Sequence, residues 1–250
     1  MRSWNKIIAI GIILALCGCG KGFNGNPSVG DGGGAYCPPA LSDFEKLQSG
    51  DLPYRKGDLH YKDAPILVVY LHGGTSRGTD NEAPIKEKAV SIIRDYLVDS
   101  NIPAIFIIPQ CPPSENWGAS MNSSLSTLIG QYENDCAGVY ILGSSMGGTG
   151  TWSLANAYPQ RFSGIMPVAG KPGAASASNF ADLKVYAVMS EADEVMTSAC
   201  EDVSAFIQSI SAAGGRTKYD QIPASEGWTH SATCEKAYDK TRLDWLFKSN

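Results

Sequence analysis

The chain has 250 residues, of which 43% are hydrophobic and 18% charged, an ordinary composition for a globular protein with room for one large α/β domain. Its formal net charge is −5, and it has no Lys/Arg cluster, which argues against nucleic acid as a partner because such binding needs a run of basic contacts to phosphates. Small molecules, carbohydrate-linked groups and proteins are the partners that these properties allow.

The N-terminal segment predicts export from a bacterial cell. Two basic residues precede the apolar run Ile7–Leu16, which is too short to span a bilayer but suits the core of a signal peptide. The run ends in Leu-Cys-Gly-Cys, which resembles a lipobox in which Gly18 precedes a lipidated Cys19. Cys17 fits less well because a bulky leucine stands before it. Residues 1–18 are therefore interpreted as a lipoprotein-type signal peptide, with an ordinary secretory signal as the alternative.

A Gly-rich stretch follows the signal. Residues 19–35 contain almost no core-forming side chains, which predicts a flexible tether. A tether behind a lipidated cysteine fits a lipid-anchored or secreted protein of the cell envelope, in the periplasm or at the cell surface. The membrane is then a partner only through the anchor. The folded domain is expected to span residues 36–250.

The domain alternates short apolar runs with helical patterns, which predicts one mostly parallel α/β sheet with helices on both faces. The predicted strands are Ile66–Leu71, Ala104–Pro109, Val139–Gly143, Gly164–Ala169, Val185–Ser190 and Thr217–Ile222. The predicted helices are Pro84–Val98, Leu125–Tyr132, Met146–Tyr158, Ser198–Ala213 and Glu235–Phe247. Only 15 residues separate Ala169 from Val185, so no large cap is expected over the sheet.

The third predicted strand runs into the sequence Gly-Ser-Ser-Met-Gly, a match to G-x-S-x-G. Strand, sharp turn and helix follow one another here, which is the context that holds a nucleophilic serine above a sheet. By position the nucleophile is Ser145, and Ser144 is the variable residue. The helix that begins at Met146 aims its N–H groups at the same place.

A serine hydroxyl needs a base, and histidine is the side chain suited to that role near neutral pH. His60 precedes the first core strand in a polar stretch, and His72 follows that strand in a His-Gly turn. His230 follows the last strand and precedes the final helix, which gives the chain order serine, acid, histidine. We therefore predict His230 as the base.

The base needs an orienting carboxylate. Asp193 lies three residues beyond the strand Val185–Ser190, where a loop can turn its side chain towards His230. Glu191 and Glu194 are rivals in the same loop. Asp193 is the predicted third member of the triad.

The predicted oxyanion hole has two backbone donors, the N–H of Met146 and the N–H of Gly74 in the loop after the first core strand. No metal or organic cofactor is expected. The chain has no CxxC or HExxH spacing and only three histidines.

Three blocks of the sequence resemble the esterase and "predicted peptidase" group of the α/β-hydrolase superfamily, which is akin to dienelactone hydrolases, polyhydroxybutyrate depolymerases and feruloyl esterases. They are LHGGTSRGTDN (71–81), PQCPPSENW (109–117) and SSMGGTGTWSLANAYPQRF (144–162). The sequence departs from that group at Thr75, Ser76 and Thr229, which bears on the expected substrate-facing walls and not on the triad. Residues 36–65 are short for the group's leading strands, which suggests a sheet that lacks one or two of them.

The resemblance implies a serine carboxylic-ester hydrolase that works through an acyl-enzyme on bulky or polysaccharide-linked esters, of acetyl or feruloyl type. A serine peptidase of the same fold is the alternative, because the triad does not separate the two. A binding lipoprotein without catalytic activity is a third reading, disfavoured by the complete triad.

Five cysteines follow the predicted signal and anchor, namely Cys37, Cys111, Cys136, Cys200 and Cys234. Outside the cytoplasm some of them are expected to pair. Cys200 follows the Asp193 loop and Cys234 follows His230, and the triad draws these two segments together. We therefore predict a Cys200–Cys234 disulfide.

Overall fold

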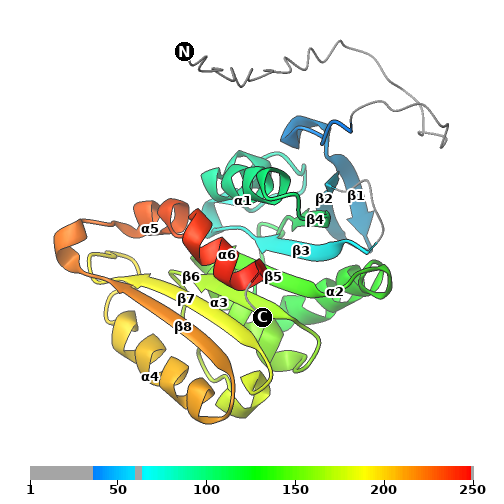
Figure 1. Ribbon diagram of the computed structural model, residues 1–250. Coiled ribbons are helices and arrows are strands. Elements are labelled where there is room, and N and C mark those ends of the chain that lie inside the picture. The colour runs from blue at the N-terminus through cyan, green and yellow to red at the C-terminus, as the bar shows by residue number, and fades with distance from the viewer. Residues whose placement is uncertain (1–35, 60–63, 249–250) are drawn as a thin grey trace, which may run out of the picture. The chain divides into compact units, whose positions relative to one another are not determined.

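The computed structural model describes residues 36–59 and 64–248. The predicted signal peptide (1–18), the predicted tether (19–35) with Cys19, and His60 lie outside the described residues. The described chain is built around one sheet of eight strands in the order β1-β2-β4-β3-β5-β6-β7-β8 (Figure 1).

The sheet is mostly parallel, as predicted. Its strands are β1 Glu45–Ser49, β2 Leu52–Leu59, β3 Ile66–Leu71, β4 Ala104–Pro109, β5 Val139–Ser144, β6 Gly164–Val168, β7 Lys184–Ser190 and β8 Arg216–Ile222. Strands β3 to β8 are parallel to one another, whereas β2 pairs antiparallel with both β1 and β4. The suggestion that leading strands are missing is wrong, because residues 45–59 fold into a tight hairpin that extends the sheet.

Helices cover both faces of the sheet (Figure 1). They are α1 Lys88–Asp99, α2 Ala119–Gly130, α3 Met146–Ala157, α4 Ala199–Ala212, α5 His230–Lys236 and α6 Lys240–Lys248. Alternate residues of each central strand point to opposite faces. In β3, Leu67 and Val69 join the core cluster under α2, α3 and α4, while Val68 and Tyr70 join the cluster under α1 and α6. A strand buried on both sides reads as a continuous apolar run, which is why sequence could locate it.

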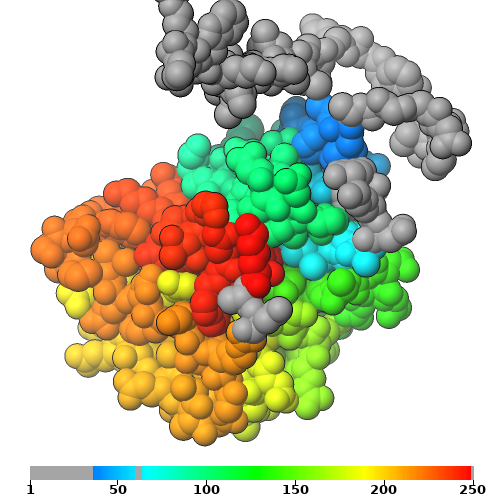
Figure 2. Space-filling view, viewed as in Figure 1, coloured from blue at the N-terminus to red at the C-terminus, as the bar shows by residue number. Residues whose placement is uncertain are grey.

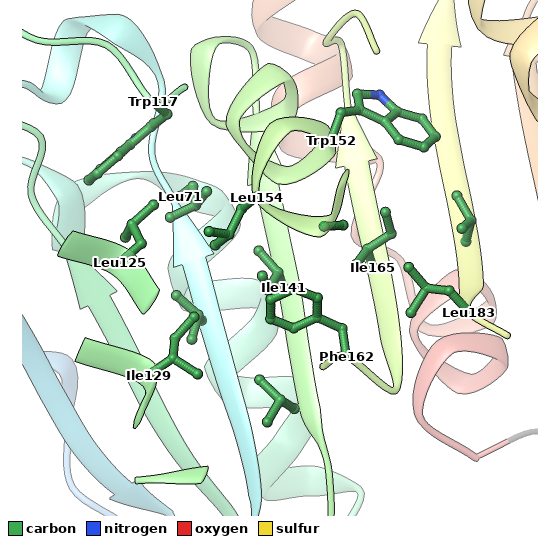
Figure 3. Close-up of a cluster of buried hydrophobic side chains, with 14 of the residues drawn as sticks. Leu71, Trp117, Leu125, Ile129, Ile141, Trp152, Leu154, Phe162, Ile165 and Leu183 are labelled. Carbon is green, nitrogen blue, oxygen red and sulfur yellow. The ribbon is translucent and has the colours of Figure 1, made fainter. Parts of the chain in front are cut away.

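Large aromatic and aliphatic side chains pack against the sheet in both core clusters. Figure 3 shows Trp117 and Leu125 beside Leu71, and Trp152 on the side nearer Ile165, all in the core cluster on the α2–α3 side of the sheet. On the opposite side the C-terminal segment lies beside α1 (Figure 2), and the rings of Tyr96 and Phe247 stack with centroids 5.9 Å apart.

Three predicted helices differ from the observed ones. The first was predicted from Pro84, but a 3₁₀ turn, η3 Pro84–Lys86, precedes α1. The second begins at Ala119 rather than Leu125, and the last is two helices, α5 and α6. Thr229 caps α5 by accepting from the N–H of Ala232 at 3.3 Å, and Asp239 caps α6 by accepting from the N–H of Arg242 at 3.0 Å. The Thr229 cap sets the start of α5 at His230. The Asp239 cap sets the start of α6 and so divides the predicted last helix into two.

The loop between β6 and β7 contains one short 3₁₀ helix, η5 Ala177–Phe180, in agreement with the predicted lack of a large cap. None of the helices within the described ranges is long and apolar enough to cross a membrane.

The predicted disulfide is wrong: in the part of the chain described here, Cys200 and Cys234 are free thiols. Cys200, on α4, packs against the core cluster on one face of the sheet, and Cys234, on α5, packs against the cluster on the other face. The triad does bring the two loops together, but the helices that follow them diverge to opposite faces, which separates the cysteines.

Helix α3 crosses the ends of β3 and β6 at backbone contact. A Cβ built on Gly147 would lie 1.8 Å from the carbonyl oxygen of Leu71, and one on Gly148 would lie 2.3 Å from that of Val168. Only glycine allows this approach.

We expect Gly147→Ala to lower the free energy of unfolding by about 1–3 kcal/mol or more, because the added methyl group meets rigid backbone rather than a movable side chain. Gly118→Ala is the matched control, since a Cβ at Gly118 meets nothing within 4 Å and should change stability by no more than about 0.5 kcal/mol. Urea unfolding of both variants measures the difference, and equal stability of the two would contradict the close crossing.

Candidate active site

Ser145 occupies the sharp turn between β5 and α3. Its backbone has φ 58° and ψ −118°, a left-handed conformation that is uncommon for a residue with a side chain. The N–H of Ser145 donates to the carbonyl of Val168 in the neighbouring strand at 2.9 Å, which holds the turn in place. The strained backbone and the glycines on either side project the Ser145 hydroxyl above the carboxyl edge of the sheet.

The structure brings together the three side chains predicted for the triad. His230 Nε2 lies 2.7 Å from Ser145 Oγ, and His230 Nδ1 lies 2.8 Å and 3.0 Å from the two carboxylate oxygens of Asp193. Because a carboxylate only accepts, Nδ1 carries the hydrogen, and Nε2 is left to accept from the serine hydroxyl. This is the tautomer that a general base requires.

Asp193 is almost completely buried, with 4% of its surface exposed. Its Oδ1 also accepts from the backbone N–H groups of Val195 at 2.9 Å and Met196 at 2.7 Å. These contacts fix the carboxylate in the loop after β7 and orient it towards the imidazole.

The two rival carboxylates of that loop bind elsewhere. Glu191 accepts from the side chain of Gln221 at 2.6 Å and from the N–H of Ala224 at 3.0 Å. Glu194 accepts from the backbone N–H of His230 at 3.0 Å, and this hydrogen bond lowers the pKa of Glu194. Glu194 thus helps to place His230, while Asp193 alone of the three contacts the imidazole.

Of the two predicted oxyanion donors, Met146 follows Ser145 in the chain and Gly74 lines the cavity at Ser145. Met146 is the first residue of α3, so its N–H has no acceptor within the helix. Gly74 begins the 3₁₀ turn η2 (Gly74–Ser76), and it lines the same cavity as Ser145 and His230. The N–H of the preceding Gly73 is already engaged by Glu87 at 3.1 Å.

His72 is a buried structural residue. The N–H of Cys111 donates to its Nε2 at 2.9 Å, and its Nδ1 donates to the carbonyl of Gly73 at 2.6 Å. The first contact requires an unprotonated Nε2 and therefore the neutral ring, and burial lowers the pKa of His72 to about 4. The indole of Trp117 donates to the carbonyl of His72 at 3.1 Å, which ties the His-Gly turn to a second loop.

The first two sequence blocks that resemble the esterase group form one packed unit. Arg77 donates to the carbonyl of Gly74 at 2.9 Å and to the carbonyl of Glu115 at 2.7 Å, and it also contacts Asn116. Gln110 accepts from the N–H of Asn81 at 2.6 Å. The residues that carry the resemblance therefore brace the loop beside Ser145.

A cavity of about 400 Å³ opens at Ser145. Its walls come from the Gly73–Thr75 loop, the start of α1 and the start of α5. Among its lining residues are Tyr70, Glu87, Ser144, His230, Ser231 and Cys234.

Sequence reasoning missed a polar cluster beneath this cavity. Glu87 accepts a hydrogen bond from the Tyr70 hydroxyl at 2.8 Å, and the hydroxyls of Ser144 and Tyr238 are 2.8 Å apart. No spacing motif marks these residues. The one local feature that could have pointed to this cluster is the carboxylate of Glu87 directly before α1.

Among the described residues, no group of three or more His, Cys, Asp or Glu side chains is arranged to hold a metal ion.

No protein-family model and no curated protein matches the sequence. Solved structures do match the chain in three dimensions. A thermostable esterase superposes with a TM-score of 0.74 and 23% identity over 83% of this chain, which spans 63% of that protein. Est1E from Butyrivibrio proteoclasticus superposes with a TM-score of 0.57 and 12% identity, over 80% of this chain and 96% of that one.

The chain has the α/β-hydrolase fold. The fold that the sequence blocks implied is thereby confirmed. An acylaminoacyl peptidase from Pyrococcus horikoshii has it too, with a TM-score of 0.56 and 12% identity over 83% of this chain and 42% of that one. Because esterases and a peptidase share the fold, the reaction has to be inferred from the candidate site itself.

We expect His72 to make the stability of this α/β-hydrolase domain fall at acid pH. Its folded pKa of about 4 lies below the unfolded value of 6.5, so the stabilisation is complete above pH 6.5 and is lost as the pH falls towards 4, by up to about 3 kcal/mol. Urea unfolding between pH 7.5 and 4.5 measures this slope.

The matched variant is His72→Gln, whose side-chain oxygen can still accept from Cys111 but does not titrate. It should be less stable at neutral pH and show a shallower loss towards acid pH than the wild type. Parallel pH profiles of the two proteins would rule out His72 as the source of the slope.

Proposed function

We propose that the protein is a serine hydrolase that cleaves carboxylic esters. The observation that carries the proposal is the imidazole of His230, held between Ser145 Oγ at 2.7 Å and Asp193 Oδ2 at 2.8 Å. A hydroxyl in contact with an oriented neutral imidazole is an activated nucleophile.

In the proposed reaction, Ser145 Oγ attacks the ester carbonyl while its proton passes to His230 Nε2. The resulting imidazolium is stabilised by Asp193 and returns the proton to the leaving alcohol as the C–O bond breaks. Water then attacks the acyl-enzyme by the same path, releasing the acid and restoring the serine.

The negative charge of each tetrahedral intermediate needs fixed donors. The N–H groups of Gly74 and Met146 are proposed for that role, because Gly74 lines the cavity at Ser145, Met146 follows Ser145 at the start of α3, and the N–H of Gly73 is taken by Glu87. The positive end of α3 adds to the same field.

Bulky or polysaccharide-linked esters of acetyl or feruloyl type are the proposed substrates. Support comes from the short β6–β7 loop, which leaves Ser145 without a large cap, and from the roughly 400 Å³ cavity beside it. One matching structure is described as ferulic acid bound to Est1E, with 12% identity to this chain.

Peptide cleavage is the second candidate, since the acylaminoacyl peptidase shares the fold. A binding lipoprotein without activity is the third, but it would not need the hydrogen bonds from Ser145 to His230 and on to Asp193. Ester hydrolysis is preferred because an alcohol leaves more easily than an amine, and no pocket for a peptide terminus was recognisable in the sequence.

We further propose that the enzyme acts in the bacterial cell envelope, held by a lipid on Cys19. The proposal rests on the apolar run Ile7–Leu16, the Gly18–Cys19 pair and the Gly-rich residues 19–35.

We expect Ser145→Ala and His230→Ala each to lower kcat by roughly 10⁴-fold, because each removes a group that acts only as part of the triad. Asp193→Asn should also be severe. Ser144→Ala and Glu191→Gln serve as controls and should remain within roughly tenfold of the wild type. A short-chain nitrophenyl ester provides the assay, with a peptide nitroanilide run in parallel.

Substantial ester hydrolysis by Ser145→Ala would remove the nucleophile assignment. Faster cleavage of the nitroanilide than of the ester would favour a peptidase, and no turnover of either by the wild type would favour a binding protein.

Metabolic labelling with a palmitate analogue in a bacterial host tests the anchor. The full-length protein should be labelled, Cys19→Ala should lose the label, and Cys17→Ala should keep it. An unlabelled protein in the culture medium would instead indicate plain secretion.

A further inference from the structure

Glu87 directs its carboxylate into the loop that carries the proposed oxyanion donor. It is the residue immediately before α1, and it accepts from the Gly73 N–H at 3.1 Å and from the Ser76 hydroxyl at 2.6 Å through Oε1. Its other oxygen accepts from the Tyr70 hydroxyl at 2.8 Å. Both oxygens are thus occupied, and two of the three donors belong to the Gly73–Ser76 loop.

Gly73 lies between this carboxylate and the nucleophile. A Cβ built on Gly73 would be 3.7 Å from Glu87 Oε1 and 3.8 Å from the Cβ of Ser145. Gly73 is thus the single residue between Glu87 and Ser145. The contacts that fix Gly73 therefore also set the distance from the loop to Ser145.

The hydrogen bond from Gly73 also decides which N–H is available to a substrate. The Gly73 N–H is held by Glu87 and is not free for a substrate, whereas Gly74, the next residue along the chain, lines the cavity. Arg77 holds the same loop by donating to the Gly74 carbonyl at 2.9 Å. The two peptide groups around Gly73 and Gly74 are thus held by side chains of opposite charge.

Glu87 is linked to the turn that bears the nucleophile as well. The Tyr70 ring packs edge-on against Tyr238 with centroids 5.9 Å apart, and the Tyr238 hydroxyl is 2.8 Å from Ser144 Oγ. Tyr70, Tyr238 and Ser144 are buried. A buried polar cluster of this kind keeps its geometry because each unsatisfied member would be costly.

We propose that Glu87 is a positioning residue of the active site, which holds the Gly73–Ser76 loop so that the Gly74 N–H meets the developing oxyanion. This inference rests on the proposed hydrolase function. Glu87 does not contact the reacting atoms, so its effect should fall on stabilisation of the tetrahedral intermediate rather than on substrate binding.

The test compares the wild type with Glu87→Ala and Glu87→Gln on a short-chain nitrophenyl ester. Glu87→Ala should lower kcat by roughly 10²-fold with KM changed less than about threefold, since a misplaced oxyanion donor costs transition-state stabilisation. Inhibition by phenylboronic acid, which forms an anionic tetrahedral adduct with an active serine, should weaken by a similar factor. Glu87→Gln keeps one acceptor oxygen for the loop and should retain about a tenth of the wild-type kcat.

Glu82→Gln is the matched control. Glu82 lies five residues earlier, pairs with Arg55 at 3.0 Å and with Lys46, and makes no contact with the Gly73–Ser76 loop. It should keep kcat within about twofold of the wild type. Circular dichroism at the assay temperature confirms that each variant is folded.

A folded Glu87→Ala with wild-type kcat and boronate inhibition would overturn the inference. Should that variant fail to fold, Glu87→Gln and Ser76→Ala decide in its place, and wild-type kcat in both would overturn it equally. Failure of the hydrolase proposal looks different, because the wild type itself would then neither cleave the ester nor react at Ser145 with a fluorophosphonate.

Discussion

The backbone contact between α3 and the ends of β3 and β6 is the constraint on which the site depends. With no side chain at Gly147, the helix starts against the Leu71 carbonyl, and the chain has a single residue in which to turn from strand to helix. Ser145 is that residue, and its positive φ is the consequence. A fold that is tightly packed elsewhere supplies the free energy that holds this strain.

The two described histidines differ in their hydrogen-bond partners, which give His72 a structural role and His230 the geometry of a general base. His72 is enclosed by backbone groups that fix both ring nitrogens, and protonation would break the bond that its Nε2 accepts. Burial lowers its pKa to about 4. His230 has one nitrogen fixed by a carboxylate and the other facing a hydroxyl. A proton gained at its Nε2 is compensated by buried Asp193, whereas a proton gained by His72 has no such partner.

Sequence located what depends on local pattern. Strands β3 to β7 were placed to within one residue because each is a short buried apolar run, and G-x-S-x-G between strand and helix singled out Ser145. Strand β8 was placed equally well although most of its residues are exposed or half-buried. The hairpin at residues 45–59 was missed because its strands mix polar and apolar residues. Glu87 could not be found, since it acts on residues 11 to 17 positions away across a loop, a relation that only the folded chain creates. The error over Cys200 and Cys234 has the same origin, because proximity of two loops does not fix the faces on which their helices lie.

Non-covalent bonds join the acid loop to the histidine loop, the task that the disulfide had been expected to perform. Ser190 Oγ donates to the Trp228 carbonyl at 2.7 Å, Glu194 accepts from the His230 N–H at 3.0 Å, and Asp193 binds the imidazole. At about 1 kcal/mol for a neutral hydrogen bond and more for one to a charge, the bonds made by Ser190 and by buried Asp193 already approach the 2–4 kcal/mol typical of a disulfide. Two of these bonds are made by atoms of Asp193 and His230 themselves and so fix their positions directly. A disulfide between α4 and α5 would have held them only indirectly, through the residues between each cysteine and the triad. The arrangement that aligns the imidazole is therefore the same one that holds the two loops together.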